Sequence, residues 1–191
     1  MFFKRKKEAI TINSYIDGKI INLGEIPDKV FSTKVMGDGF AMIAKDNILK
    51  SPTKGVISFI AQTNHAIGIK LQNDVQILIH IGLDSATTKK ENFKLEVKQG
   101  QEVNMGEKLV EIDNKLLENT LYIPLVIVEN PNTVKYHLSN LNQEGNSGIK
   151  VINFDWLWLI KRLNLNLSYS IFSHILFLPL LQQNSHLSYQ N

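Results

Sequence analysis

The chain has 191 residues, 43% of them hydrophobic and 20% charged, which is ordinary for a soluble globular protein with one sizeable core. It contains no cysteine, which excludes disulfides, thiolate nucleophiles and cysteine metal sites and is compatible with a reducing compartment. The formal net charge is +3, but residues 4–7 (KRKK) supply four positive charges and the other 17 basic and 18 acidic residues nearly balance, so we expect no nucleic-acid partner.

The chain begins with a basic segment, and we assign residues 1–14 to a flexible N-terminus. Its first residues, MFFKRKK, could make a weak contact with an anionic membrane surface. A solvated terminus without a partner is the more ordinary interpretation of such a start. No apolar run follows the basic residues, so we do not expect a secretory signal.

Short runs with alternating or β-branched residues dominate from residue 11 to about residue 129. They predict an all-β fold, an antiparallel β-sandwich or barrel-like single domain with short helical turns. The segment NKLLENT, at 114–120, is expected to form one such helical turn. Turn signals separate the strands at DGK (17–19), GDG (37–39), SPTKG (51–55), QND (72–74), KQG (98–100) and NMGE (104–107).

The composition changes near residue 155, where a tail begins that is rich in Leu, Asn and Ser and has almost no charge. Residues 163–181 approach the length of a membrane span, but their asparagines, serines and histidine disfavour that interpretation. We therefore predict a domain over residues 15–154 and a disordered or loosely packed apolar tail over residues 155–191.

Two histidines lie in aliphatic, strand-like surroundings, His65 in QTNHAIGIKL and His80 in VQILIHIGLD. If the QND hairpin has a loop with an even number of residues, both rings lie on one face, ~4.5–8 Å apart. A slip of one residue in the register would place them on opposite faces. We expect Val75, Ile77, Ile79 and Ile81 to point into the core, and Ile67, Ile69, Leu71 and Leu78 to lie on the face of the histidines.

The chemistry that such a pair can perform is limited by its neighbours. The simpler interpretation is that both histidines are structural, with their hydrogen bonds satisfied inside the fold. Thr63, which is in register with His65, favours a functional site instead. Two imidazoles and a hydroxyl lack the third ligand of a usual catalytic zinc centre. No nucleotide-binding or serine-hydrolase signature is present. What remains is a histidine nucleophile that takes up a group, with neighbours that set its tautomer and charge.

Five segments resemble, in order and spacing, the glucose-specific IIA component of the bacterial phosphoenolpyruvate-dependent sugar phosphotransferase system. The likeness runs from about residue 15 to residue 131, more faintly to residue 154, and the tail is not part of it. The segments are VFSTKVMGDGFAM (30–42), SPTKGVI (51–57), TNHAIGI (63–69), LIHIGLDS (78–85) and VKQGQEVNMGEKLVEID (97–113).

The resemblance implies a cytoplasmic phosphoryl carrier that requires no cofactor. It would accept a phosphoryl group from the small carrier HPr and pass it to the IIB domain of a sugar permease. By this resemblance, His80 is phosphorylated through Nε2, His65 stabilises the phosphoryl group, and Thr63 orients the ring of His65. The residues that match partner-binding positions are Val30, Phe31, Met36 and Leu78 in an apolar rim, and Asp38 and Asp84 around the site.

Several alternatives remain open at the level of the sequence. The same apolar patch would serve a regulatory binding module that is never phosphorylated, and Asp38 and Asp84 are equally well explained as turn residues. The chain could also be the IIA domain of a permease whose other domains are encoded elsewhere. The resemblance further implies regulation of transporters or kinases, with a zinc ion shared between His65, His80 and a partner. The sequence does not identify the sugar.

Overall fold

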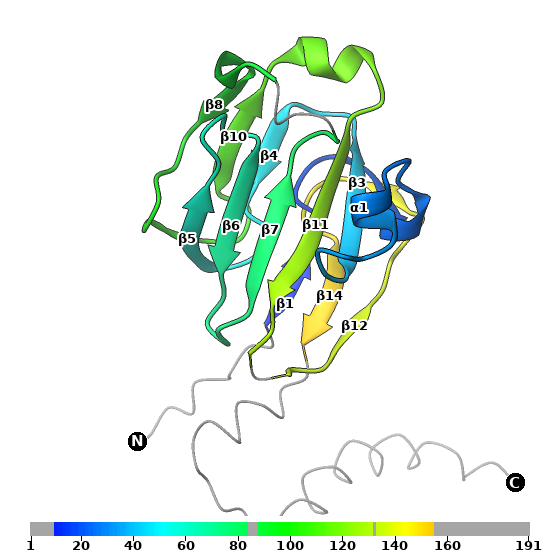
Figure 1. Cartoon of the computed structure of the whole chain (residues 1–191), viewed down its shortest axis with the longest axis vertical. Coiled ribbons are helices and arrows are strands. Elements are labelled where there is room, and N and C mark those ends of the chain that lie inside the picture. The colour runs from blue at the N-terminus through cyan, green and yellow to red at the C-terminus, as the bar shows by residue number, and fades with distance from the viewer. Residues whose placement is uncertain (1–9, 84–87, 132, 155–191) are drawn as a thin grey trace, which may run out of the picture. The chain divides into compact units, whose positions relative to one another are not determined.

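The computed structural model describes residues 10–83, 88–131 and 133–154. Within these ranges, every strand pairs antiparallel with its neighbours, and helical segments are short (Figure 1). The predicted all-β class is therefore confirmed. The expected helical turn at 114–120 is also present, as the 3₁₀ helix η4 (Asn114–Glu118). The tail over residues 155–191 lies outside the described residues.

An eight-stranded sheet forms the body of the fold, with the order β13-β2-β3-β11-β7-β6-β5-β9. Its strands in chain order are β2 (Gly18–Asn22), β3 (Gly39–Ala44), β5 (Gly55–Ile60), β6 (Ala66–Lys70), β7 (Gln76–His80), β9 (Glu102–Val103), β11 (Tyr122–Glu129) and β13 (Glu144–Gly145). One three-stranded sheet contains β1 (Thr11–Asn13), β12 (Tyr136–Leu138) and β14 (Lys150–Phe154). The other contains β4 (Ile48–Lys50), β8 (Phe93–Leu95) and β10 (Lys108–Ile112).

The inner face of the eight-stranded sheet forms the main core. Strand alternation sends every second side chain to this face, and Ile67, Ile79 and Leu125, on three adjacent strands, are fully buried there. This burial supplies the main driving force for folding. The predicted core residues Val75, Ile77, Ile79 and Ile81 all have 0% exposure, so that prediction is confirmed.

A short helical segment covers part of the outer face of the same sheet (Figure 1). It comprises η1 (Leu23–Glu25) and α1 (Lys29–Ser32), which bring Phe31 onto Ala41 of β3 and Val126 of β11. The helix α1 begins after Asp28, whose carboxylate accepts hydrogen bonds from the backbone N–H groups of Val30 and Phe31, at 2.8 and 3.2 Å. This N-cap satisfies donors that the first helical turn leaves unpaired.

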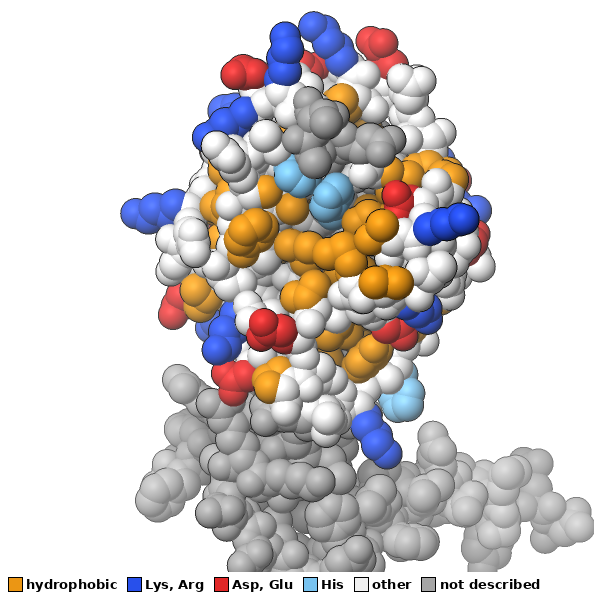
Figure 2. Space-filling view, in the orientation of Figure 1, with side chains coloured by type: hydrophobic (Ala, Val, Ile, Leu, Met, Phe, Trp, Pro, Cys, Tyr) orange, Lys and Arg blue, Asp and Glu red, His pale blue; other side chains and the backbone are white. Residues whose placement is uncertain are grey.

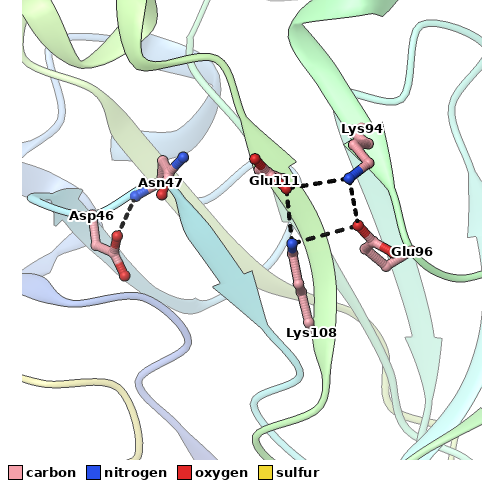
Figure 3. Close-up of polar contacts among 6 residues, drawn as sticks. All are labelled: Asp46, Asn47, Lys94, Glu96, Lys108 and Glu111. Atoms are coloured by element: carbon pink, nitrogen blue, oxygen red, sulfur yellow. Dashed lines mark hydrogen bonds and ion pairs between the residues drawn. The ribbon is translucent and has the colours of Figure 1, made fainter.

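Four charged side chains form an ion-pair network on the β4-β10-β8 sheet (Figure 3). Lys94 lies 3.2 Å from Glu96, and Lys108 lies 3.4 Å from Glu96 and 2.8 Å from Glu111. Hydrogen bonding to Lys94 lowers the pKa of Glu96. These groups are solvated and pair with one another, so we assign them to the protein surface rather than to a site.

One strand near the N-terminal end extends the ordered fold. The strand β1 falls within residues 1–14, which the sequence analysis assigned to a flexible N-terminus. Its Ile12 is fully buried and pairs with Ile152 of β14, so residues 11–13 belong to the fold and that boundary was placed too late. A strand of three residues whose partner lies 140 positions away leaves no local pattern. Residues 1–9 lie outside the described ranges.

Across the described ranges, no helix combines the length and the hydropathy that a bilayer crossing requires. Residues 163–181, whose composition raised the question, lie outside these ranges.

Candidate functional site

The rings of His65 and His80 lie side by side, with their centroids 4.8 Å apart and their planes at 74°. Figure 2 shows histidine side chains meeting on one face of the molecule, bordered by hydrophobic side chains. Both rings are partly buried. The expectation that the two histidines share one face is therefore confirmed.

The predicted reason for their meeting is wrong. In the β6–β7 hairpin, Ala66 rather than His65 lies opposite His80. The N–H of Leu71 donates to the carbonyl of Val75, so the loop holds three residues, 72–74, rather than an even number. The odd loop reverses the assignment of one strand to its faces. Ile67, Ile69 and Leu71 consequently face the core, and only Leu78 of the predicted set shares the face of His80.

The rings meet because His65 lies outside the strand. It precedes β6 in a turn where Asn64 has a left-handed φ of 62°, a conformation that asparagine tolerates better than most residues. The side-chain amide of the buried Asn64 donates to the carbonyl of Phe93 at 3.1 Å. The carbonyl of His65 also accepts from the N–H of Ile81 at 2.7 Å, which ties this turn to the end of β7. Strand alternation therefore does not govern the direction of the His65 ring.

The backbone beyond β7 sets the tautomer of His80. Its Nδ1 lies 2.6 Å from the carbonyl oxygen of Gly82, and a carbonyl oxygen can only accept. Nδ1 therefore carries the proton, and Nε2 presents a lone pair. Gly82 has φ of 81°, which is readily adopted by glycine and costly for most other residues. This local turn brings the carbonyl under the ring.

The second histidine forms a hydrogen bond with its own neighbour in the turn. The hydroxyl oxygen of Thr63 lies 2.5 Å from Nδ1 of His65. A hydroxyl can donate as well as accept, so Thr63 can leave the proton of His65 on Nε2. In that tautomer His65 offers a donor, whereas His80 offers a lone pair.

Burial keeps both imidazoles neutral near pH 7. It lowers the pKa of His65, and it is the largest cause of the lowered pKa of His80. The hydrogen bond to Gly82 opposes the burial effect on His80, and the carboxylate of Asp28 also raises the pKa of that ring. A neutral ring with a free Nε2 is the nucleophilic form of histidine.

Asp28 is a functional candidate that the sequence analysis missed. Asp28 interacts electrostatically with His80. It is also the N-cap residue of α1, the helix that carries Phe31. Its signal in the sequence was an aspartate directly before a short helical segment, which is easily overlooked because α1 has only four residues.

The acidic residues named from the sequence have different outcomes. Asp38 forms an ion pair with Lys34 at 2.8 Å and accepts from the N–H of Gly39 at 2.8 Å. Its interaction with Tyr136 adds to burial in raising the pKa of that phenol. Asp38 thus has partners within the chain, as its turn interpretation suggested. Asp84 lies outside the described residues.

The predicted apolar rim is divided between surface and interior. Val30 and Met36 are 47% and 37% exposed, and Leu78 is half-buried. Phe31 is only 4% exposed, because its ring packs against the sheet and against His80, with the ring centroids 5.3 Å apart. Its position is therefore the wall of the site rather than the exposed rim.

The same geometry bears on metal binding. Across the described ranges, no three His, Asp or Glu side chains come together in a way that could hold an ion. The histidine pair offers two nitrogens, and a further ligand would have to come from elsewhere.

Comparison with known proteins places this geometry in context. The family model described as phosphoenolpyruvate-dependent sugar phosphotransferase system, EIIA 1, matches residues 10–136. A PTS system glucose-specific EIIA component from Oceanobacillus iheyensis is 38% identical over 134 residues, covering 69% of this chain and 81% of the relative. One from Haemophilus influenzae is 34% identical over 132 residues, covering 66% and 80%. The solved structure of glucose permease IIA from Mycoplasma capricolum has a TM-score of 0.70 and 33% identity, covering 80% of this chain and 99% of that one.

Proposed function

This chain belongs to the EIIA 1 family of the phosphoenolpyruvate-dependent sugar phosphotransferase system and is therefore a phosphoryl carrier of that system, and we propose that His80 carries the phosphoryl group on Nε2. The observation that supports this choice is the hydrogen bond from Nδ1 of His80 to Gly82. It leaves the lone pair on Nε2 of a ring that burial keeps neutral.

The transfer itself needs positioning and charge stabilisation more than covalent assistance. The Nε2 lone pair attacks the phosphorus of the donor's phosphohistidine, an N–P bond forms, and the donor's N–P bond breaks with its electron pair returning to the donor ring. Nδ1 of His80 keeps its proton, so the phosphorylated ring gains positive charge. The carbonyl of Gly82 and the carboxylate of Asp28 both favour that charge.

His65 serves the phosphoryl group in this proposal. With the Thr63 hydroxyl donating to Nδ1, the Nε2–H of His65 can donate to a phosphoryl oxygen. The adjacent ring supplies a neighbouring donor without occupying the nucleophile. A second transfer then moves the group to a thiolate of the acceptor, where an S–P bond forms as the N–P bond of His80 breaks.

We assign the phosphoryl donor to HPr and the acceptor to the IIB domain of a sugar permease, both in the cytoplasm. Val30, Met36 and Leu78 supply apolar surface for brief docking in this proposal. The family resemblance assigns acidic partner-binding roles to Asp38 and to Asp84, which lies outside the described residues. Such transient encounters bury less than about 1,200 Å² in total. Regulated transporters or kinases would use the same surface, and residues at the N-terminus would make weak contact with a membrane surface.

No cofactor is required for this chemistry. A zinc ion could still be shared at an interface, where His65 and His80 would supply two nitrogens and a partner the remaining ligands. In that state the lone pair of His80 would be occupied, and zinc would compete with phosphorylation.

The test is incubation with phosphoenolpyruvate, the first enzyme of the system and HPr, followed by mass spectrometry of the intact chain. We expect a mass increase of one phosphoryl group that depends on HPr. A chain that remains unmodified while HPr itself is phosphorylated would contradict the proposal.

A further inference from the structure

A β-bulge in β5 reverses the direction of one aromatic side chain. Ile57 pairs with Ile69 of β6, but Phe59 pairs with Gly68, so Ser58 is an extra residue on the β5 side. Without it, Phe59 would share the inner face of the fully buried Ile57. The carbonyl of Ser58 accepts from the side-chain amide of Gln99 at 3.0 Å, which holds the bulge.

The bulge brings Phe59 onto the face of the sheet that carries His80. Phe59, Gly68 and Leu78 form one row across β5, β6 and β7, and Ala66 and His80 lie in the neighbouring row. Gly68 has no side chain, and a Cβ there would lie 3.0 Å from Cβ of Phe59. The Ser58 hydroxyl lies equally near that Cβ position, at 3.0 Å, so the apolar side chains of Leu78 and Phe59 flank Gly68 with one small polar group between them.

Phe59 is unusually open for an aromatic residue. Its side chain is 48% exposed, and no other aromatic residue in the described ranges falls in the exposed class. An exposed aromatic side chain beside other apolar groups is typical of a surface that another molecule covers. Aromatic residues are also enriched among those that dominate binding energy.

The distance from His80 places Phe59 within the reach of a docked protein. Two strand spacings and two residues along the strand amount to roughly 12 Å. A transient interface of about 600 Å² per partner, taken as a disc, has a radius of roughly 14 Å. A protein that brings its phosphorylated residue to His80 therefore also covers Phe59.

We propose that Phe59 is an aromatic anchor for docking of the phosphoryl donor, HPr, and contacts apolar surface next to the donor's own phosphohistidine. The inference rests on the proposed function, because it takes His80 as the centre of the interface. It adds a residue on β5 to a surface otherwise built from α1, β7 and the segment before β3.

The experiment compares Phe59→Ala in the full chain with Met105→Ala, which removes a similarly exposed apolar side chain from the turn between β9 and β10. Calorimetric titration with unphosphorylated HPr gives the dissociation constant, and rapid-quench kinetics with phospho-HPr give kcat and KM. We expect Phe59→Ala to raise the dissociation constant and KM about tenfold. Its kcat should stay within about twofold, because Phe59 does not touch the reacting atoms. Phe59→Tyr should restore binding, and Met105→Ala should behave as the original chain does.

Three results would overturn the inference. These are an unchanged dissociation constant for Phe59→Ala, an equal loss in Met105→Ala, and a loss confined to transfer toward the IIB acceptor. Phe59→Leu keeps an apolar side chain over Gly68 and provides the same comparison should Phe59→Ala lower the unfolding midpoint.

The variant His80→Gln separates this inference from the proposed function. Its continued phosphorylation would refute the role of His80, whereas normal HPr binding by Phe59→Ala would refute only the anchor.

Discussion

Nδ1 of His80 lies 2.6 Å from the carbonyl oxygen of Gly82, two residues further along the chain. This contact settles which nitrogen holds the proton and which presents the lone pair. In the proposed mechanism, the same carbonyl would favour the positive charge that the ring gains if Nε2 forms a bond to phosphorus. One backbone group would then both prepare the nucleophile and stabilise the phosphorylated form.

Replacement of His80 is the most severe change that we predict. His80→Gln should reduce phosphoryl uptake from phospho-HPr by at least about 10³-fold, since the adjacent imidazole of His65 has its Nδ1 occupied by the Thr63 hydroxyl and presents a donor at Nε2. His137→Gln, which alters an exposed histidine on β12, is the matched control and should leave uptake unchanged. Quench-flow with labelled phosphoenolpyruvate measures both. Uptake by His80→Gln at the original rate would remove His80 from the mechanism.

Replacement of His65 should affect uptake of the phosphoryl group and its onward transfer differently. His65→Gln keeps a donor beside the phosphoryl group but loses the imidazole, so we expect uptake from HPr within a few-fold of the original chain. Onward transfer to the IIB domain should fall by about 10²-fold, the lower end of what a positioned acid–base group contributes. Single-turnover measurements of each step test this. An unchanged onward rate would exclude a role for His65 in that step.

The lowered pKa of His80 predicts how uptake depends on pH. Burial holds the folded-state pKa of His80 below 6.5, so the neutral, nucleophilic ring predominates at pH 7. The rate should decline only as the pH falls below 6.5 and passes through that lowered pKa. A rate–pH profile at saturating phospho-HPr, with an independent check that HPr stays phosphorylated, provides the measurement. A midpoint above 6.5 would contradict the assigned environment.

The lowered pKa values of His65 and His80 also predict how the free energy of unfolding changes with pH. Below pH 6.5 the unfolded chain binds protons at His65 and His80 more readily than the folded chain. The free energy of unfolding must therefore decrease as the pH falls from 6.5 to the lowered folded-state pKa values. Above that window, these two groups add no pH dependence to the free energy of unfolding. Denaturation of His65→Gln/His80→Gln should show a weaker dependence over that window. If the variant and the original chain showed the same pH dependence, that dependence would come from other groups.

Asp28 acts through both charge and capping, and two variants separate these roles. Asn caps helices about as well as Asp, so Asp28→Asn should retain α1 while losing the charge, which moves the pH profile of uptake to lower pH. Asp28→Ala loses the cap as well and should cost about 1 kcal/mol of stability. Thermal denaturation and rate–pH profiles measure the two effects. Identical profiles for Asp28→Asn and the original chain would remove the electrostatic role.

The sequence predicted the core side of β7 correctly because alternation is a local property that a single strand displays. The pairing of β6 with β7 could not be read in the same way, since it depends on whether the loop is odd or even. That parity is set by Asp74, whose left-handed φ of 63° closes a three-residue loop. The QND segment is compatible with either length.

The histidine pair illustrates a second limit. Its members were named correctly, yet their approach comes from the turn at Asn64 and not from strand register. Similarly, the outward direction of Phe59 depends on a bulge, which appears only when the opposing strand is known. Backbone irregularities of this kind are concentrated where the site is built, and alternation patterns assume that they are absent.

The central claim, that Nε2 of His80 is the phosphoryl acceptor, is tested most directly by two-dimensional ¹H–¹⁵N NMR of the imidazole nitrogens. The spectrum would be recorded on the ¹⁵N-labelled chain before and after phosphorylation by HPr. The structure predicts that the His80 Nε2 signal alone gains coupling to phosphorus, while Nδ1 remains protonated and hydrogen-bonded to Gly82. Coupling at His65, or at Nδ1 of His80, would contradict this account.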